Sequence, residues 1–454
     1  MKNAVRFLAA LSGWGALMAC LPDGNTARVC EPDETASCTC ADGSTGLKTC
    51  EPDGSGWSAC QCALPDGGVD AASADRAAPR DAAPGQDRAT AADAGPPDAA
   101  RPDSARRDAA RPDTAGGVDS SVGDAGDWVF ELVDSTPGSA VGYSSSIALD
   151  TQGRPRISYY DLTGEQLLYA SRGAGGWSHE VVDSDGDVGV ITALAIGSDD
   201  EPQIAYFDFD REDLRYARKP AGSGWVKEAV ATSGGQGRSL ALALGPGNAP
   251  FISSLDESDT SLLLSRRVGN GWASETVDGE DGNNTSIAVE PDGTVHIAYF
   301  AWIPGQIRYA VGTPGAFATS VAVTFSGDGW QYNTALAVAA GTQHLVYDDP
   351  DGQDLGYATR SGSTWSSRLL DTSGDVGSEA DIAIGSDGDL HVVYFSFTAG
   401  ELRYALRHNG TWSISKLRSV TNAGGEPAIV LDASNRPHVS FQDGHDTTLW
   451  YAHR

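Results

Sequence analysis

Residues 146–183 decide the fold, and they read SIALDTQGRPRISYYDLTGEQLLYASRGAGGWSHEVVD. They contain four runs with alternating apolar residues, at 146–149, 156–160, 166–171 and 177–183, separated by short turns rich in Gly, Asp and Pro. Alternation with a period of two is typical of β-strands, and such turns join antiparallel strands. The stretch therefore predicts one antiparallel sheet of four strands.

The same pattern returns seven times between residues 127 and 454. A central Ala marks the first strand at Ala148, Ala195, Ala243, Ala288, Ala337 and Ala383, with Val430 in the seventh copy. A second marker in the third strand lies at Tyr169, Tyr216, Tyr309, Tyr357, Tyr404 and Tyr451, with Leu264 in the third copy. Both markers recur about every 47 residues. Four antiparallel strands in a repeat of this length are the blade of a β-propeller, which needs neighbouring blades to bury its two faces.

The last copy stops at Arg454 after its third strand and lacks the fourth strand that begins with Trp. Residues 127–134, DWVFELVD, match residues 177–183, WSHEVVD, and so supply the missing strand. We expect both faces of this strand to be buried, with Trp128, Phe130 and Leu132 on one face and Val129 and Val133 on the other. The predicted fold class is all-β, a seven-bladed β-propeller closed by its N-terminal strand.

The repeats resemble the bacterial propellers of the sialidase-like (BNR-type) superfamily, whose Asp-box hairpins place a Trp between the third and fourth strands. Residues 175–178, GGWS, and 361–365, SGSTW, occupy that place, although most copies lack the Asp of the box. Sialidases of that group hold a substrate carboxylate with three convergent Arg and use a Tyr activated by a Glu. Arg238 is the only Arg immediately before an innermost strand, so the resemblance carries over no catalytic residue.

Charge excludes some partners and points to others. The chain has 62 Asp and Glu against 31 Lys and Arg, which argues against nucleic acid as a ligand. In the propeller the acids concentrate in the loops after second strands and between blades, which emerge on the same face. Solubility of a secreted protein is one interpretation of this acidic rim, and a site for calcium or for a cationic or polyhydroxylated ligand is the other.

Aromatic residues on the same loops indicate a sugar-binding surface. They lie at Tyr143, Phe209, Trp302, Trp330, Tyr332 and Phe397, and they do not share a repeat position. The predicted binding residues are Tyr143, Asp161, Asp208, Trp302, Trp330, Tyr332 and Asp348. The candidate calcium ligands are Asp183, Asp185 and Asp187, at positions i, i+2 and i+4, without the Glu that closes an EF-hand loop. No other cofactor is expected.

No motif of a hydrolase nucleophile, a zinc protease, a P-loop or a dinucleotide site occurs. His296, His344, His391 and His438 repeat at one second-strand position, so we expect them to pack or hydrogen-bond within separate blades. We therefore expect a recognition or scaffold module, monomeric, that binds a glycan or protein through the acidic loop face. The alternative is a glycoside hydrolase or lyase of sialidase-like architecture, which would need a carboxylate pair near the ring axis.

Residues 1–20 predict export. Lys2 and Arg6 precede an apolar stretch too short to span a bilayer. The ending Leu17-Met18-Ala19-Cys20 resembles the bacterial lipoprotein signal, which implies a lipid-anchored Cys20 and a place in the cell envelope, at the outer membrane or cell surface. The alternative is an ordinary cleaved signal with an incidental Cys.

Residues 21–62 predict a small disulfide-rich module. Its six cysteines are Cys30, Cys38, Cys40, Cys50, Cys60 and Cys62, and their pairing is open. A metal site is the alternative, although the spacing is not that of zinc ribbons. This segment is similar to Cys-rich segments of other Gram-negative surface lipoproteins. Residues 63–126 are rich in Ala, Asp, Pro and Arg and predict a disordered linker that acts as a tether, or else as a partner-binding tail.

Overall fold

The structure is a computed structural model that describes residues 35–39, 45–49, 119–123, 127–232, 235–303, 305–326, 333–339, 341–419 and 426–454. In the first three ranges, and at residues 280–281, only the backbone is described. The chain has two units, and in one of them, Ala16–Pro112, strand β1 (Thr35–Thr39) pairs antiparallel with β2 (Thr45–Thr49). The predictions for Cys20 and for the six other cysteines fall outside the described side chains. No helix in the described residues has the length and hydropathy needed to cross a membrane.

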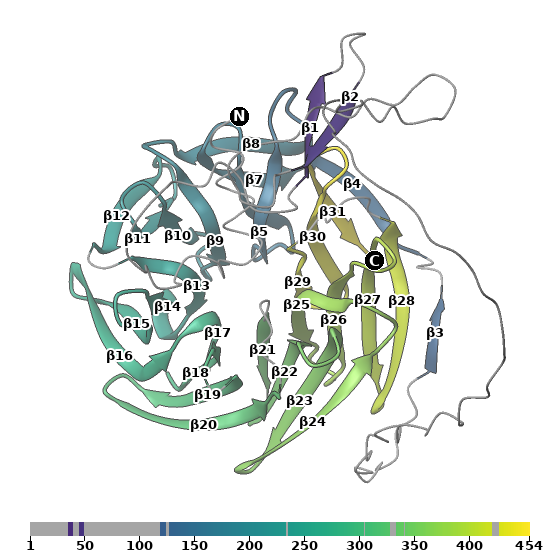
Figure 1. Ribbon diagram of the computed structural model, residues 1–454. Coiled ribbons are helices and arrows are strands. Elements are labelled where there is room, and N and C mark those ends of the chain that lie inside the picture. The colour runs from purple at the N-terminus through teal and green to yellow at the C-terminus, as the bar shows by residue number, and fades with distance from the viewer. Residues whose placement is uncertain are drawn as a thin grey trace, which may run out of the picture. The chain divides into compact units, whose positions relative to one another are not determined.

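The unit that contains Asp113–Arg454 is a ring of seven antiparallel blades (Figure 1), which confirms the predicted fold. The inner strands are β5 (Val141–Leu149), β9 (Val188–Ile196), β13 (Gln236–Leu244), β17 (Asn283–Val289), β21 (Thr334–Ala339), β25 (Val376–Ile384) and β29 (Ala428–Leu431). The second strands are β6 (Pro155–Asp161), β10 (Pro202–Asp208), β14 (Pro250–Asp256), β18 (Val295–Ala301), β22 (Thr342–Asp349), β26 (Leu390–Ser396) and β30 (Pro437–Asp443).

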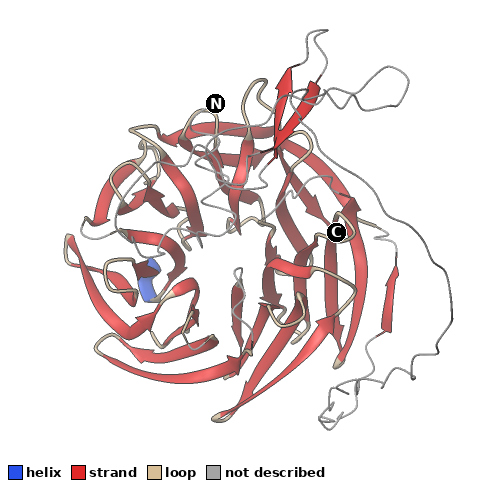
Figure 2. Cartoon of the chain, in the orientation of Figure 1, coloured by secondary structure: helices blue, strands red, loops and turns tan. Residues whose placement is uncertain are grey.

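Two further strands complete each blade. The third strands are β7 (Gln166–Gly173), β11 (Asp213–Arg218), β15 (Ser261–Val268), β19 (Gln306–Thr313), β23 (Asp354–Ser361), β27 (Glu401–His408) and β31 (Thr448–His453). The outer strands are β8 (Gly176–Asp183), β12 (Val226–Ala231), β16 (Gly271–Asp281), β20 (Ala316–Thr324), β24 (Thr364–Asp371), β28 (Thr411–Ser419) and β4 (Val129–Asp134). Figure 2 shows strands throughout the ring, and the described part of the chain has one short 3-10 turn, η1 (Pro246–Asn248).

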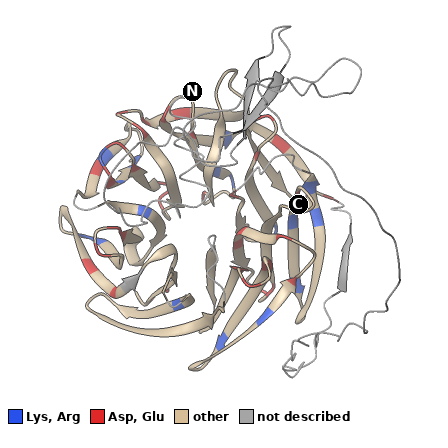
Figure 3. Ribbon diagram, in the orientation of Figure 1, with Lys and Arg blue, Asp and Glu red and all other residues tan. Residues whose placement is uncertain are grey.

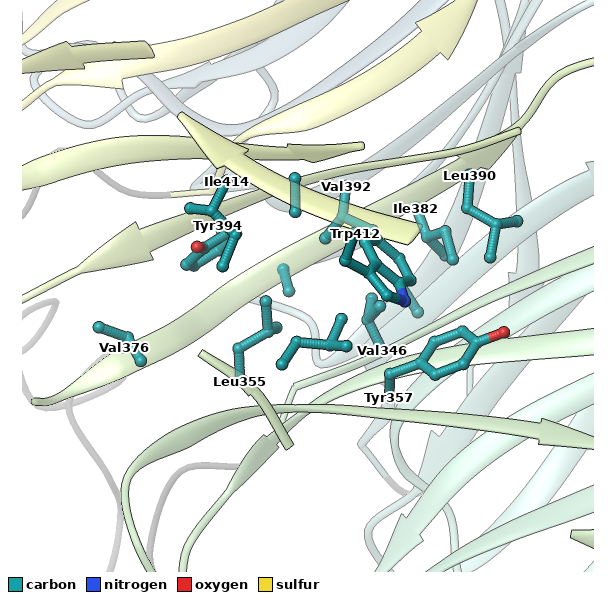
Figure 4. Packing of buried hydrophobic residues seen from close by; sticks show 14 of the residues in the cluster. Val346, Leu355, Tyr357, Val376, Ile382, Leu390, Val392, Tyr394, Trp412 and Ile414 are labelled. Atoms are coloured by element: carbon teal, nitrogen blue, oxygen red, sulfur yellow. The ribbon is translucent and has the colours of Figure 1, made fainter. Parts of the chain in front are cut away.

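Six of the seven blades carry a Trp on the outer strand that packs edge-on against the marker Tyr of the preceding blade, and in the fourth blade Phe317 packs in the same cluster as Leu264 of the third. Trp412 and Tyr357, for example, have ring centroids 5.3 Å apart, and Figure 4 shows them within one buried cluster that draws on two neighbouring blades. The same contact is made by Trp128 with Tyr404, Trp177 with Tyr451, Trp225 with Tyr169, Trp272 with Tyr216 and Trp365 with Tyr309. The two sequence markers are therefore the two halves of the contact between blades.

Strand β4 closes the ring by pairing antiparallel with β31, with Ala452 opposite Phe130 and His453 opposite Val129. This confirms the predicted closure. The expected burial of β4 is only half right, because Val129 is 50% exposed and Leu132 is 44% exposed while Trp128 and Val133 are buried. A bulge between Leu449 and Trp450 shifts the register, so strict alternation along β4 does not hold.

A fifth strand lies on the outer edge of the sixth blade. Strand β3 (Asp119–Gly123) pairs parallel with β28, with Asp119 opposite Ser413 and Gly123 opposite Ser415. These five residues belong to the range 63–126 that the sequence assigned to a linker.

The four repeated histidines have the role expected of them. Nδ1 of His344 lies 2.8 Å from the hydroxyl of Tyr357, and Nδ1 of His391 lies 2.6 Å from that of Tyr404. His296 with Tyr309 and His438 with Tyr451 repeat this pair. Each histidine bonds the marker tyrosine of its own blade, so none is available to a shared site.

Candidate functional site

Many acids of the loop face hydrogen-bond a residue of the neighbouring blade. A Tyr hydroxyl on a second strand donates to an Asp on the outer strand of the preceding blade, with Tyr206 and Asp183 2.7 Å apart. The same bond joins Tyr159 to Asp134, Tyr394 to Asp371 and Tyr299 to Asp278. A cation adds an ion pair to this contact, because Lys227 Nζ lies 2.6 Å from Asp183 Oδ1. Although burial opposes it, these bonds lower the pKa of Asp183. Such acids are structural.

A second set of acids caps the turns after second strands. Asp161 is buried and accepts the backbone N–H groups of Thr163 and Gly164, both at 3.0 Å. Asp208 is fully buried and accepts the backbone N–H of Arg211 as well as the guanidinium of Arg215 at 3.0 Å. Asp161 and Asp208 were predicted as binding residues, and in the structure both have partners within the turns after their own strands.

The candidate calcium ligands Asp183, Asp185 and Asp187 have separate protein partners. Asp185 pairs with Arg211 at 3.1 Å, and Asp187 accepts the hydroxyl of Tyr160 at 2.5 Å. The described residues contain no group of three or more His, Cys, Asp or Glu side chains that could hold a metal ion. The calcium expectation therefore rests on the sequence spacing alone.

Three of the loop aromatics do share a repeat position, contrary to the sequence interpretation. Phe209, Trp302 and Phe397 each lie just past a second strand, in the second, fourth and sixth blades. Each ring packs edge-on against an aromatic two residues earlier, as Trp302 does against Phe300 at 5.9 Å and Phe397 does against Phe395 at 4.8 Å. Trp302 is 39% exposed and Phe397 is 40% exposed, so they extend an aromatic stack into solvent. Trp330 and Tyr332 lie outside the described residues.

The feature that the sequence reasoning missed is a ring of residues at the start of the inner strands. This inner ring lies four positions before the marker Ala or Val430, and its members are Ser144, Ile191, Ser239, Asn284, Asn333, Glu379 and Glu426. Ser144, Asn284, Glu379 and Glu426 have positive φ angles between 44° and 57°. The inner strands are bulged here, as between Ser378 and Asp381 in β25. Hydrogen bonds join neighbouring blades beside these positions, since the N–H of Thr285, the residue after Asn284, donates to Ser239 Oγ at 3.1 Å.

Two neighbouring blades place a glutamate in this ring. The backbone N–H of Glu426 donates to Glu379 Oε2, and Ser145 Oγ donates to the backbone carbonyl of Glu426 at 3.3 Å. Asp348, at the end of the second strand of the fifth blade, accepts Ser378 Oγ at 3.3 Å, next to Glu379. We call Asn333, Asp348, Glu379, Glu426, Ser144 and Tyr143 the acidic arc, which crosses the fifth, sixth, seventh and first blades.

Electrostatics set the acidic arc apart from the structural acids. Burial, together with the charge of Glu379, raises the pKa of Glu426 to about 8, against hydrogen bonding from Ser144. Burial likewise raises the pKa of Glu379. Burial raises the pKa of Asp348 to about 7, with the nearby charges of Asp375 and Asp349 adding to the effect. Figure 3 shows how acidic residues recur around the ring. Asp161 and Asp183 accept several donors each, whereas Asp348 accepts Ser378 Oγ and Glu379 accepts the Glu426 N–H.

The predicted binding residues thus divide. Asp348 and Tyr143 lie in the acidic arc, where burial raises the pKa of Tyr143 and Glu426 is a neighbouring charge. Trp302 stands on another loop. A groove of about 350 Å³ on the described surface lies at residues 135–140, Thr163 and residues 446–448, and none of the predicted binding residues lines it. The signal for Glu379 and Glu426 was present in the sequence as the fourth residue before each marker.

Comparison with known proteins finds distant structural similarity and no family. No family model matches the chain, and no curated protein matches it. Among solved structures it is similar to a fucose-specific lectin from Aleuria aurantia, with 13% identity over 58% of this chain and 90% of that chain and a TM-score of 0.42. It is also similar to the polysaccharide lyase Uly1, with 10% identity over 70% of this chain and 90% of that chain and a TM-score of 0.44. The NanB sialidase from Streptococcus pneumoniae matches with 10% identity over 72% of this chain and 70% of that chain, at a TM-score of 0.41. These values carry no argument about ligand or activity, and the seven-bladed propeller itself stands on the strand pairing.

Proposed function

We propose that the propeller is a recognition module that binds a glycan or protein ligand on its loop face at the acidic arc. The inner ring supports this proposal. Positions that hold a repeat protein together keep one side chain in most copies, as the Trp of the outer strand does in six of the seven blades. The inner ring instead varies from Ile191 to Ser239 to Glu379 at one backbone position, and its two glutamates stand side by side. Such variation at a fixed position suits a binding surface.

A glycan array tests this proposal. We expect the protein to retain a defined set of glycans, and we expect Glu379→Gln to weaken their binding. Asp446→Asn is the matched control, because Asp446 is an exposed acid on the same face and lies outside the acidic arc. The proposal would be wrong if the protein bound no glycan on the array and a proteome-scale display also yielded no protein ligand.

A second candidate is a glycoside hydrolase or lyase. The observation in its favour is that burial and the charge of Glu379, whose carboxylate accepts the Glu426 backbone N–H, raise the pKa of Glu426 to about 8. An acid of that pKa is protonated at neutral pH and can donate a proton to a leaving group, while its partner is the second carboxylate that such chemistry needs. Release of new reducing ends from a bound glycan, lost in Glu426→Gln, would favour the enzyme over the binding module.

We also propose that Cys20 anchors the protein to the cell envelope through lipid. The support is the sequence ending Leu17-Met18-Ala19-Cys20 after a short apolar stretch. We expect Cys20→Ser to leave the precursor uncleaved or to move the protein out of the membrane fraction. Full membrane retention of a processed Cys20→Ser protein would show that attachment does not depend on this residue.

A further inference from the structure

We propose that the acidic arc binds a primary ammonium group. The inference rests on the proposed function, because it names the ligand chemistry of the same site. Glu379 and Glu426 come from adjacent blades, touch through the Glu426 N–H, and keep part of their surface open to solvent. The charge of Glu379 acts on the carboxyl group of Glu426, and two neighbouring carboxylates repel each other unless a proton or a cation lies between them.

The missing countercharge is the first argument. Several buried carboxylates of the described residues have a cation of their own, as Asp183 has Lys227 at 2.6 Å and Asp371 has Arg403 at 2.8 Å, while Asp161 has backbone N–H donors instead. No Lys or Arg of the described chain pairs with Glu379 or Glu426, and no basic group is among the charges that shift their pKa values. The sixth and seventh blades thus bring two acids together, and no base of the described chain pairs with either of them.

Unused acceptor atoms are the second argument, and they do not depend on charge. Oε2 of Glu426 and Oδ1 of Asn333 are buried, and neither accepts a hydrogen bond from the described residues. Asn333 occupies the inner-ring position in the blade next to Glu379, and β21 packs beside β25. A buried oxygen without a donor is costly, so a ligand that brings N–H donors gains those bonds.

A primary ammonium fits these acceptors better than a metal ion does. It carries three N–H donors and one positive charge. The acidic arc offers Glu379, Glu426 and Asn333, whereas calcium prefers six or more oxygens, and no metal-holding group of acids and histidines is found in the described part of the chain. The titratable neighbours are Tyr143 and Asp348, which add acidic and not basic character. Amino sugars and lysine side chains both present this ligand group.

The test uses calorimetry on the full chain with two matched oligosaccharides. Glucosamine oligomers carry a primary ammonium on each ring, and N-acetylglucosamine oligomers of equal length do not. We expect binding of the glucosamine oligomer to be stronger by roughly 10- to 100-fold, the range for hydrogen bonds to a charged group. Glu379→Gln and Glu426→Gln should each remove most of that preference, and Asp446→Asn should keep it. A further titration uses Nα-acetyllysine amide in place of the sugar. Binding of this compound would show that the site accepts an ammonium group on a peptide as well as on a sugar.

Three results would overturn the inference. They are equal affinity for the two oligosaccharides, a preference for the amine that survives both Gln variants, and calcium binding that the amine does not displace. Because the comparison of ligands uses the unchanged protein, it stands even if a variant fails to fold. Binding of uncharged glycans with no preference for amines would contradict the ammonium proposal and leave the proposed recognition function intact. The two proposals can therefore fail separately.

Discussion

At the scale of single residues, the acids of the loop face differ by the donors that surround them. Asp161, Asp183 and Asp208 are buried and satisfied, so their charge serves the turns and the blade contacts. Glu379, Glu426 and Asp348 have few donors, and burial keeps their pKa values high. Sequence spacing could place all of these residues on one face, but it could not tell which carboxylates had donors, because the donors come from other blades.

Asp208 provides a test of the structural role. We predict that Asp208→Ala destabilises the propeller by roughly 3–5 kcal/mol, the cost of leaving a buried cation without its partner. The cation in question is Arg215, whose guanidinium is 17% exposed and lies 3.0 Å from Asp208. Urea unfolding of the variant and of Asp446→Asn measures the difference. A stability equal to that of the unchanged protein, together with lost ligand binding, would return Asp208 to the binding site.

The Glu379–Glu426 contact predicts a pH dependence of stability. The pKa of Glu426 is raised to about 8 in the folded protein, above its unfolded value, so the folded state holds the proton more tightly. This group's contribution to stability is full at pH values below the unfolded pKa and is lost as the pH rises towards 8, at about 1.4 kcal/mol per pH unit within that window. Glu426→Gln should therefore gain stability relative to the unchanged protein between pH 5.5 and 8.5.

Melting curves of the two proteins at both pH values make this measurement. Asp127→Asn serves as the control, because this acid is exposed and no histidine of the described residues pairs with it, so its removal should give the same difference at pH 5.5 as at pH 8.5. A difference for Glu426→Gln that is flat or falls with pH would mean that Glu426 is ionised in the folded state.

At the scale of elements, the aromatic residue on each outer strand, Trp in six blades and Phe317 in the fourth, sets how one blade meets the next. We predict that Trp412→Ala lowers stability by roughly 3–5 kcal/mol, because Trp412 is 1% exposed and fills the space beside Tyr357. Trp412→Phe should cost far less, since Phe317 holds this position in the fourth blade and packs within its cluster. Thermal melts of the two variants compare their losses of stability. Equal losses would mean that the indole itself, and not its apolar bulk, is required.

The elements were predictable where the pattern repeats. Markers in the first and third strands fixed the number of blades, the order of strands and the closing role of residues 127–134, because each property follows from the period. The bulges were not predictable in detail, and they explain why Leu132 is exposed and why Glu379 has a positive φ angle. The pairing of β3 with β28 also has no counterpart among the repeats, so no periodic signal could reveal it.

At the scale of the whole molecule, closure joins the two ends of the propeller chain through more than backbone pairing. Glu131 on β4 accepts two hydrogen bonds from Arg172 of the first blade, at 2.8 and 2.7 Å, and one from the indole of Trp177 at 3.1 Å. Asp134 accepts the hydroxyl of Tyr159 at 2.7 Å. The strand that completes the seventh blade is therefore also the surface on which the first blade packs, so its loss affects both.

We predict that a chain beginning at Ser135 is far less stable than one beginning at Gly126. The shorter chain loses the buried Trp128 and Val133 and the half-buried Phe130. At roughly 1.5–3 kcal/mol for each large side chain fully buried, this loss approaches the stability of a typical domain. It also exposes the edge of β31, which invites aggregation.

The chain beginning at Gly126 keeps β4 but lacks β3, so it separates the two N-terminal strands. We expect it to melt close to the full chain, because the seven blades stay closed and only the outer edge of β28 loses a partner. Differential scanning calorimetry of the three chains, with light scattering for aggregation, reads out both effects. The chains beginning at Ser135 and at Gly126 could instead melt at the same temperature and stay equally soluble. In that case β4 does not hold the ring closed, the bonds of Glu131 and Asp134 are not needed for closure, and contacts among the inner strands close the ring.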